Sequence, residues 1–257
     1  MSNLQTNPSF LSFDLFQPHP LVAAFSTRLG GLSEGVYESM NLSFSGADDR
    51  QTVLANFKLF ANAIGVDWER MVMTSQVHED AILIAGEEHA GMGVGVARTF
   101  ESVDGIYTES KGLPILTAHA DCTPIFFYDK RRGAAGLAHS GWRGTSRKIA
   151  EKMVELFLLR GSRAEDILCA IGPTICVDCY EVGSEVVEAI EAAVITQKEK
   201  PHLDLKETNR NMLTASGILP RHIEISEHCT KCDSRLFFSH RRSGSARGGH
   251  VACICLL

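Results

Sequence analysis

The spacing of apolar residues predicts one amphipathic helix in the first quarter of the chain. Between Thr52 and Ile64 the apolar residues recur at the three- and four-residue intervals that place them on one helical face. Thr52 is a suitable N-terminal cap, and Gly65 is a typical residue at which a helix ends. We expect residues 1–20, which precede this helix, to form a flexible N-terminal arm.

Short apolar runs dominate the chain after this helix and predict a strand-rich fold. Turn residues separate them, as at Asp129–Gly133, which predicts a hairpin turn. Helices are predicted from residue 145 or 146 to 158, at 183–194 and at 204–216. The predicted strands are 71–74, 81–85, 105–108, 113–118, 124–128, 134–139, 167–171, 222–225, 236–239 and 251–256.

This mixture of strands and helices lacks a strict strand–helix alternation, which disfavours a Rossmann fold and favours an α+β or layered α/β class with mixed β-sheets. No repeat, low-complexity tract or linker divides the sequence. We therefore expect residues 21–257 to form a single catalytic domain.

Charge and composition narrow the classes of partner. The formal net charge is −6, so neither nucleic acid nor an anionic membrane is an expected partner, and an anionic substrate requires a local cluster of arginines. The first twenty residues contain no Lys or Arg, and no run approaches the roughly 18 apolar residues of a membrane-spanning helix. We expect a soluble cytoplasmic protein, and a monomer.

Three short segments concentrate reactive side chains at the ends of predicted strands: 75–78, 120–124 and 138–144. They contain His78, Cys122 and His139, and two imidazoles with one thiolate are good ligands for a zinc ion that keeps its fourth position open. The same residues permit a cysteine hydrolase with Cys122 as nucleophile and His139 as base. Structural histidines beside an inert cysteine, or a non-catalytic metal-binding interaction protein, are further alternatives.

The same segments resemble the signature of the laccase-domain family, also called YfiH-like or multicopper polyphenol oxidase. The resemblance extends over most of the chain, including residues 24–31, 40–42, 171–173, 179–183 and 237–242. It implies a zinc ion on His78, Cys122 and His139, and a layered α/β/β/α fold. It also implies phosphorolysis of adenosine, inosine, guanosine and methylthioadenosine, with possible adenosine deaminase activity.

The multicopper label fits this sequence poorly. Four copper ions require many histidines in paired motifs, whereas the chain has 10 histidines and no His-x-His pair. Copper is nevertheless an alternative occupant of a zinc site, because its intrinsic affinity for such ligands is higher. The family resemblance thus makes purine nucleosides and phosphate the expected partners and zinc the expected cofactor.

Neighbouring residues suggest how these substrates are held. Arg28 and Arg143 stand beside glycines and are candidates for binding phosphate, because a guanidinium donates hydrogen bonds in pairs. Gln76, with Ser75, is a candidate for orienting the base. Trp142 is expected to pack rather than to stack on a purine.

Other neighbours have more than one candidate role. Asp121 is a candidate partner for a ligating imidazole, Asp104 is either an orienting carboxylate or a turn residue, and His119 is expected to lie in the core or behind a ligand. His250 stands where the family usually has an arginine, so His250 or Arg247 must replace it if that arginine binds substrate.

The eight cysteines are unevenly distributed, and the absence of an export signal argues against a disulfide framework. Cys176 with Cys179 and Cys229 with Cys232 together have the composition of a four-cysteine zinc site. The family resemblance implies no such site. Buried thiols or a reversible disulfide are therefore expected there.

Overall fold

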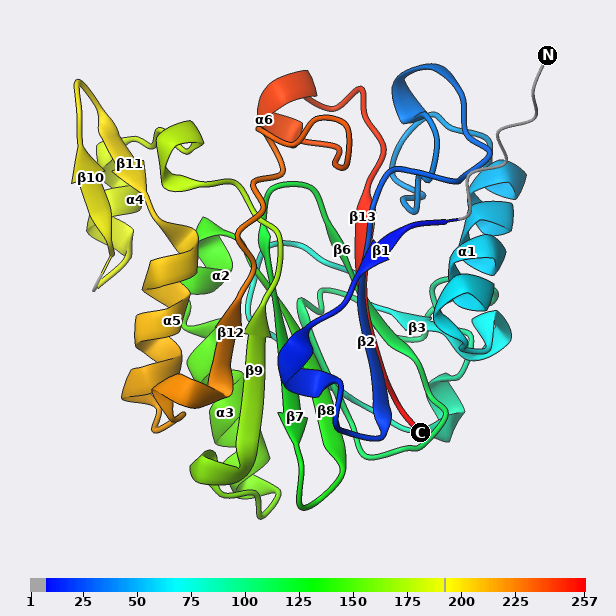
Figure 1. Cartoon of the computed structure of the whole chain (residues 1–257), viewed down its shortest axis with the longest axis horizontal. Coiled ribbons are helices and arrows are strands. Elements are labelled where there is room, and N and C mark those ends of the chain that lie inside the picture. Colours follow the sequence, from blue (N-terminus) through cyan, green and yellow to red (C-terminus); the bar gives the residue numbers. More distant parts are fainter. Residues whose placement is uncertain (1–7, 192) are drawn as a thin grey trace.

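Two large β-sheets form the centre of the protein in the computed structural model, which describes residues 8–191 and 193–257 (Figure 1). The first sheet has the strand order β1-β2-β13-β6-β3 and the second has the order β12-β9-β7-β8-β5-β4. The first contains β1 (Phe10–Leu11), β2 (Leu21–Ser26), β13 (His250–Leu256), β6 (Ile115–His119) and β3 (Val72–Met73). The second contains β12 (Ile223–Ile225), β9 (Ile167–Ile171), β7 (Thr123–Asp129), β8 (Ala134–Ser140), β5 (Gly105–Thr108) and β4 (Ile82–Ala85).

Helices and a small hairpin lie around these two sheets (Figure 1). A separate hairpin contains β10 (Ile195–Gln197) and β11 (Pro201–Leu203). The α-helices are α1 (Arg50–Ile64), α2 (Trp142–Ser146), α3 (Ile149–Leu159), α4 (Ser184–Ala189), α5 (Leu205–Ala215) and α6 (His240–Ser243).

Three apolar clusters hold the layers together. One lies between the two sheets and joins residues such as Phe25 of β2 to Phe126 of β7. A second packs α1 against the outer face of the first sheet, and a third packs α3 and α5 against the outer face of the second. The order helix, sheet, sheet, helix, visible in Figure 1, confirms the predicted layered α/β/β/α sandwich with mixed sheets.

The N-terminal segment departs from the predicted flexible arm. Residues 1–7 lie outside the described residues, but residues 8–20 pack against the sheets. Phe10 and Leu11 pair with β2, while Phe13 and Phe16 are buried in the cluster between the sheets. Burial of two phenyl rings offsets the entropy lost on ordering this segment.

Several local expectations are refined by the structure. Helix α1 begins earlier than predicted because Asp49, rather than Thr52, is its N-cap and accepts a hydrogen bond from the Thr52 amide. The helix predicted at 183–194 is limited to α4, with residue 192 outside the described residues. Residues 236–239 form no strand, since their apolar side chains enter the core from an irregular loop.

The described helices have no segment that is long and apolar enough to cross a membrane.

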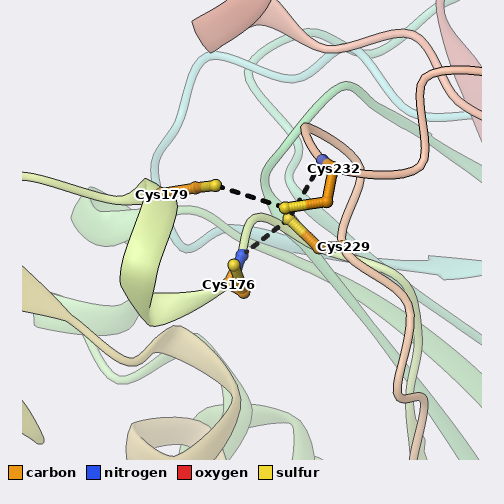
Figure 2. Close-up of side chains that lie close together, drawn as sticks. All are labelled: Cys176, Cys179, Cys229 and Cys232. Carbon is orange, nitrogen blue, oxygen red and sulfur yellow. Dashed lines mark hydrogen bonds between the residues drawn. The ribbon is translucent and has the colours of Figure 1, made fainter.

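Two cysteine-containing turns lie side by side near the ends of β9 and β12 (Figure 2). Cys176 and Cys179 come from the first turn, and Cys229 and Cys232 come from the second. All four are free thiols in the structure. The two predicted pairs therefore form one cluster, which lies apart from the histidine-containing site described next.

Candidate metal centre and its cavity

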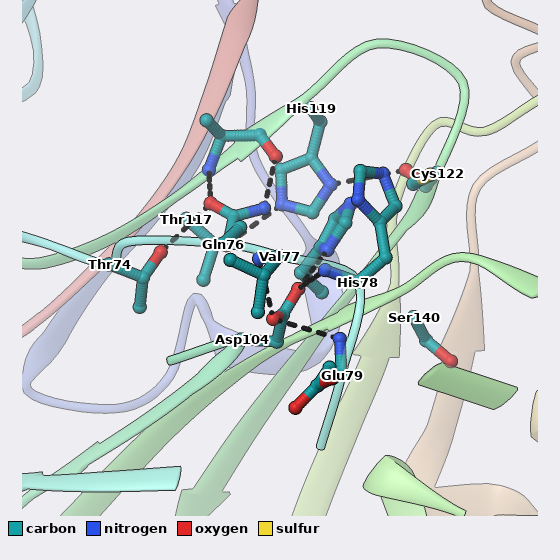
Figure 3. Close-up of polar contacts among 12 residues, drawn as sticks. Thr74, Gln76, Val77, His78, Glu79, Asp104, Thr117, His119, Cys122 and Ser140 are labelled. Atoms are coloured by element: carbon teal, nitrogen blue, oxygen red, sulfur yellow. Dashed lines mark hydrogen bonds and ion pairs between the residues drawn. The ribbon is translucent and has the colours of Figure 1, made fainter. Parts of the chain in front are cut away.

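The fold brings His78, Cys122 and His139 together from both sheets. Figure 3 shows His78 and Cys122 beside Asp104. His78 follows β3 of the first sheet, Cys122 lies in the link from β6 to β7 that crosses between the sheets, and His139 is part of β8 in the second sheet. One ligand atom from each lies within 4.8 Å of the other two. The three residues that the sequence predicts as ligands are therefore positioned to hold one metal ion.

Asp104 fixes the orientation of the His139 ring. Its carboxylate is fully buried, and Oδ1 lies 2.8 Å from Nδ1 of His139. Because the carboxylate accepts a hydrogen bond from Nδ1–H, Nε2 is left as the ligand atom, the arrangement usual for a metal-binding histidine. Burial alone would raise the pKa of Asp104, but hydrogen bonds from His139 and from the Glu79 and Val77 amides outweigh it and lower that pKa.

The same carboxylate shapes the loop that carries His78. Asp104 accepts hydrogen bonds from the backbone amides of Val77 (2.9 Å), His78 (3.0 Å) and Glu79 (3.0 Å). His78 has a φ of 63°, a left-handed conformation that is uncommon for residues other than glycine. Three amides converging on one buried anion stabilise that conformation, so Asp104 orients two of the three candidate ligands. Of the two roles considered from the sequence, it has the orienting one.

The electrostatics of Cys122 and His139 suit a metal site. Burial alone would raise the pKa of Cys122, but the charge and hydrogen bond of His139, with a smaller contribution from His78, lower it to about 6. Burial alone would lower the pKa of His139, but Cys122 and Asp104 outweigh it and raise that pKa to about 9. A thiolate is therefore available near neutral pH, and thiolate is the form of cysteine that binds metals.

Gly141 leaves room for the thiolate. A Cβ at this position would lie 2.7 Å from Sγ of Cys122 and 3.7 Å from Cδ2 of His78. Contacts as short as the first are essentially absent from folded proteins. Glycine is thus required at the start of the segment that leads from His139 into α2.

His119 supports the segment that carries Cys122. His119 is buried, its Nδ1 lies 3.1 Å from the carbonyl oxygen of Cys122, and its Nε2 lies 2.8 Å from Oγ1 of Thr117. Burial holds its pKa well below the usual value, so the ring is neutral and donates to the carbonyl. His119 therefore lies directly behind a ligand, as the sequence suggests.

Asp121 does not contact an imidazole. Its carboxylate instead accepts hydrogen bonds from Thr230 Oγ1 (2.6 Å), Ser239 Oγ (3.0 Å) and the Arg241 amide (2.6 Å). The suggested role as a partner of a ligating histidine is wrong for this residue. Asp121 anchors the 230–241 loop next to Cys122.

Gln76 joins the His78 loop to the first sheet. Its Oε1 accepts from the Ala118 amide at 2.6 Å and from Thr74 Oγ1 at 2.8 Å, while its Nε2 donates to the Ala118 carbonyl at 2.7 Å. These bonds occupy most of the hydrogen-bonding capacity of the amide. Gln76 lines the cavity, but it satisfies backbone groups rather than presenting a free donor and acceptor to a base.

The metal ligands open onto a cavity of about 380 Å³. Its wall includes the three ligands, the apolar side chains of Phe44 and Met73, and two arginines, Arg98 and Arg247. Nε of Arg98 donates to the Met73 carbonyl at 2.8 Å, whereas Nε of Arg247 is buried without a hydrogen-bond partner among the described residues. The cavity thus combines a metal site, an apolar wall and cationic groups.

The two arginines predicted to bind phosphate lie elsewhere. Arg28 donates to the carbonyl oxygens of Glu38 and Ser234 and stacks 4.5 Å from the Phe238 ring centroid, next to a different depression in the surface. Arg143 is exposed, and its guanidinium lies 4.3 Å from the Trp142 ring centroid. Neither lines the cavity at the metal ligands.

Arg247, not His250, takes the cavity position near the C-terminal strand. His250 is fully buried, and its Nε2 accepts a hydrogen bond from the Phe238 amide at 2.7 Å. Sequence reasoning named Arg247 only as a substitute for the family arginine and missed Arg98. No motif marks Arg98, because its place in the cavity depends on how the 91–98 loop folds over β3.

Comparison with known proteins supports a common origin with enzymes of nucleoside metabolism. A family model described as "Multi-copper polyphenol oxidoreductase laccase" matches residues 22–257. Purine nucleoside phosphorylase YlmD of Geobacillus stearothermophilus is 38% identical over 91% of this chain and 89% of its own length. Adenosine deaminase RL5, from an unknown prokaryotic organism, is 35% identical over 88% of this chain and 91% of its own.

Solved structures extend this similarity to the fold. The crystal structure of the Bacillus licheniformis hypothetical protein YfiH matches with a TM-score of 0.92 and 36% identity, covering 97% of both chains. The structure of YlmD from Geobacillus stearothermophilus matches with a TM-score of 0.88, covering 95% of this chain and 94% of that one. Together with the family match, these similarities show that the chain belongs to the multi-copper polyphenol oxidoreductase laccase family.

Proposed function

We propose that the protein is a zinc-dependent purine nucleoside phosphorylase that cleaves adenosine, inosine, guanosine and methylthioadenosine with phosphate. The observation that carries this proposal is the cavity in which His78, Cys122 and His139 lie together with Arg247, whose Nε has no hydrogen-bond partner among the described residues. Relatives named purine nucleoside phosphorylase support the reaction class. We further propose that it acts as a monomer in the cytoplasm.

The donor set fits zinc. Two imidazole nitrogens and one thiolate match a catalytic zinc site that keeps one position for water or substrate. No fourth Cys, His or carboxylate joins this group within residues 8–191 and 193–257. When bound, zinc supplies a Lewis acid that polarises a substrate oxygen or lowers the pKa of water. Copper remains the alternative occupant.

Arg247 is the best candidate for holding phosphate. Burial lowers the pKa of its guanidinium, and the negative charges of nearby Asp121 and Cys122 offset only part of this effect. A partly desolvated guanidinium with a free Nε–H is able to donate two parallel hydrogen bonds to a phosphate. Phosphate bound there would lie in the same cavity as the metal ligands.

The apolar wall suits a nucleobase. Phe44 and Met73 line the cavity, and Phe44 is held by stacking on Phe57 at 5.2 Å between ring centroids. A volume of about 380 Å³ lies within the range, roughly 300–1,000 Å³, of small-molecule sites. A cavity lined by apolar side chains as well as by arginines favours a substrate pair of nucleoside and phosphate.

Deamination of adenosine is proposed as a second activity of the same site. One relative is named adenosine deaminase, and a zinc-bound water is the nucleophile that such hydrolysis requires. The alternatives are a cysteine hydrolase that uses Cys122 and His139, and a non-catalytic metal protein. The participation of His78 in the cluster favours a metal site over a hydrolytic dyad, and the cavity beside the ligands favours an enzyme.

Product analysis tests the proposal. Zinc-loaded protein is mixed with adenosine in the presence and absence of phosphate, beside a Cys122→Ser variant and a Cys255→Ala control that removes a remote buried thiol. We expect adenine and ribose 1-phosphate to form only with phosphate, in the wild type and the control but not in Cys122→Ser. Formation of inosine would show that the protein also deaminates adenosine. Failure of zinc-containing protein to form either product would contradict the nucleoside assignment. Activity that survives metal removal would favour the cysteine hydrolase.

A further inference from the structure

The sheet topology brings two Cys-x-x-Cys turns to the same edge of the second sheet. Strands β9 and β12 are parallel neighbours, with Ile171 opposite Ile225. The carboxyl ends of parallel strands point the same way, so the chain leaves both strands on one side. The pairing continues beyond the strands as a parallel bridge between Thr174 and Cys229. Cys176 and Cys179 therefore meet Cys229 and Cys232, although Cys179 and Cys232 are 53 residues apart in the sequence.

The four sulfur atoms have the spacing of a metal site rather than of disulfides. All four lie within 4.8 Å of one another, and Sγ of Cys179 is 3.4 Å from Sγ of Cys232 (Figure 2). A tetrahedral zinc with Zn–S bonds of about 2.3 Å places its sulfur ligands about 3.8 Å apart. A disulfide requires a separation of about 2.05 Å. The observed spacing is close to that of the tetrahedron.

Two backbone amides point at one sulfur atom of the cluster. Sγ of Cys229 accepts hydrogen bonds from the amides of Cys176 (3.3 Å) and Cys232 (3.4 Å). The second bond, from an amide three residues later, closes the Cys229–Cys232 turn around its own sulfur.

Two cationic side chains fix the loops beside the cluster. Nζ of Lys206 donates to the carbonyl oxygens of Ser226 and His228, just before Cys229. The Arg242 guanidinium donates to the carbonyls of residues 230 and 231 within the second turn. A site with four thiolates and one divalent cation carries a net negative charge, and these side chains place positive charge next to it.

We propose that Cys176, Cys179, Cys229 and Cys232 bind a second zinc ion, in a tetrathiolate site distinct from the metal centre in the cavity. Because thiolates fill all four tetrahedral positions, this site is closed and structural rather than catalytic. Two Cys-x-x-Cys turns are the spacing that structural zinc sites commonly use. The second zinc cross-links the loop after β9 to the loop after β12.

This cross-link lies next to the proposed catalytic ligand. Thr174, two residues before Cys176, donates to the carbonyl of Asp121, and Thr230, next to Cys229, donates to its carboxylate. Asp121 precedes Cys122. The tetrathiolate site thus stabilises both loops that hold the Cys122 segment in place.

Metal analysis tests this proposal without any assay of activity. The full-length protein is loaded with zinc under reducing conditions, freed of excess metal, and analysed for zinc and iron per chain. We expect two zinc ions in the wild type, one in Cys122→Ser and one in Cys179→Ser/Cys232→Ser. The matched control Cys255→Ala, which removes a buried thiol outside both groups, should keep two.

Cobalt substitution provides a second, spectroscopic measurement. Cobalt bound by four thiolates gives strong thiolate charge-transfer and ligand-field absorption, and the Cys179→Ser/Cys232→Ser variant should lose most of it. Three results would overturn the proposal. The first is the absence of zinc from Cys122→Ser protein after zinc loading, and the second is iron at the stoichiometry expected for zinc. The third is a mass, measured without reduction, that is lower by two hydrogens for each disulfide bridge. None of these results depends on whether the protein acts on nucleosides.

Discussion

Replacement of Asp104 by asparagine tests whether one buried carboxylate organises the metal centre. The substitution keeps the size of the side chain but leaves only one oxygen. If that oxygen still faces His139 and the His78 amide, the new amide group faces the Val77 and Glu79 amides, which lose their acceptor. A fully buried donor without a partner costs roughly 1–3 kcal/mol. Because these two hydrogen bonds are partly buried, we expect a loss of at most roughly 2–6 kcal/mol in the free energy of unfolding.

The effect on metal binding is a separate quantity. Removing the partner of a metal-binding histidine typically weakens metal affinity about 10- to 100-fold, which corresponds to roughly 1.4–2.8 kcal/mol. We expect Asp104→Asn to fall in this range because it removes the charge that raises the basicity of His139 and disturbs the loop that carries His78.

Competition with a chromophoric chelator measures the zinc affinity, and denaturant unfolding of the metal-free protein measures stability. Asp129→Asn is a matched control, because Asp129 is also buried and accepts backbone hydrogen bonds, from Arg131 and Arg132, in a hairpin turn away from the cavity. We expect the control to bind zinc as the wild type does. Equal zinc affinities for Asp104→Asn, Asp129→Asn and the wild type would refute the role assigned to Asp104.

Three further predictions concern the cavity. Arg247→Ala should raise the KM for phosphate roughly 10- to 100-fold in steady-state kinetics, the loss expected for a hydrogen bond to a charged group, while Arg28→Ala leaves it unchanged. Gly141→Ala should abolish tight zinc binding in metal analysis because its Cβ would crowd the ligating thiolate. Gly95→Ala, whose Cβ would make only ordinary van der Waals contacts, should bind normally. Zinc affinity should rise about tenfold per pH unit between about pH 6 and 9, because metal binding then displaces one proton, from His139. Below about pH 6 the affinity should depend on pH more steeply, because Cys122 is also protonated there.

Each of these predictions has a contrary outcome. An Arg28 variant with a raised KM for phosphate would restore the assignment made from the sequence. Gly141→Ala with normal zinc content would show that the thiolate is not a ligand. An affinity that does not change between pH 6 and 9 would mean that His139 is already neutral before the metal binds.

The sequence predicts most strands because strands depend on local pattern, and it marks the three candidate ligands that the structure brings together. Residues 105–108 and 167–171 alternate or run apolar over whole strands, and His78, Cys122 and His139 are chemically distinctive residues at strand ends. Burial of the 8–20 segment was not predictable, since Phe13 and Phe16 reach the core only because the two sheets leave a place for them between their edges.

The cavity arginines show the same limit. Arg28 and Arg143 stand next to glycines in sequence, which is a local signal, but the fold directs one to backbone carbonyls and the other to Trp142. Arg98 and Arg247 have no local signal and reach the cavity through loops. The shared role of Asp104 likewise depends on pairing between β5 and β8, which brings it to His139.

The origin of the metal ligands in both sheets has a consequence for the kinetics of unfolding. His78 follows a strand of the first sheet, His139 belongs to the second, and Cys122 lies in the link between them. The complete ligand set therefore exists only after the two sheets have docked, so bound metal stabilises the native state more than any species that precedes docking. Interactions that form after the transition state slow unfolding and leave the folding rate nearly unchanged. We expect metal occupancy to set the lifetime of the folded protein, with the metal-free form opening first along the seam between its sheets.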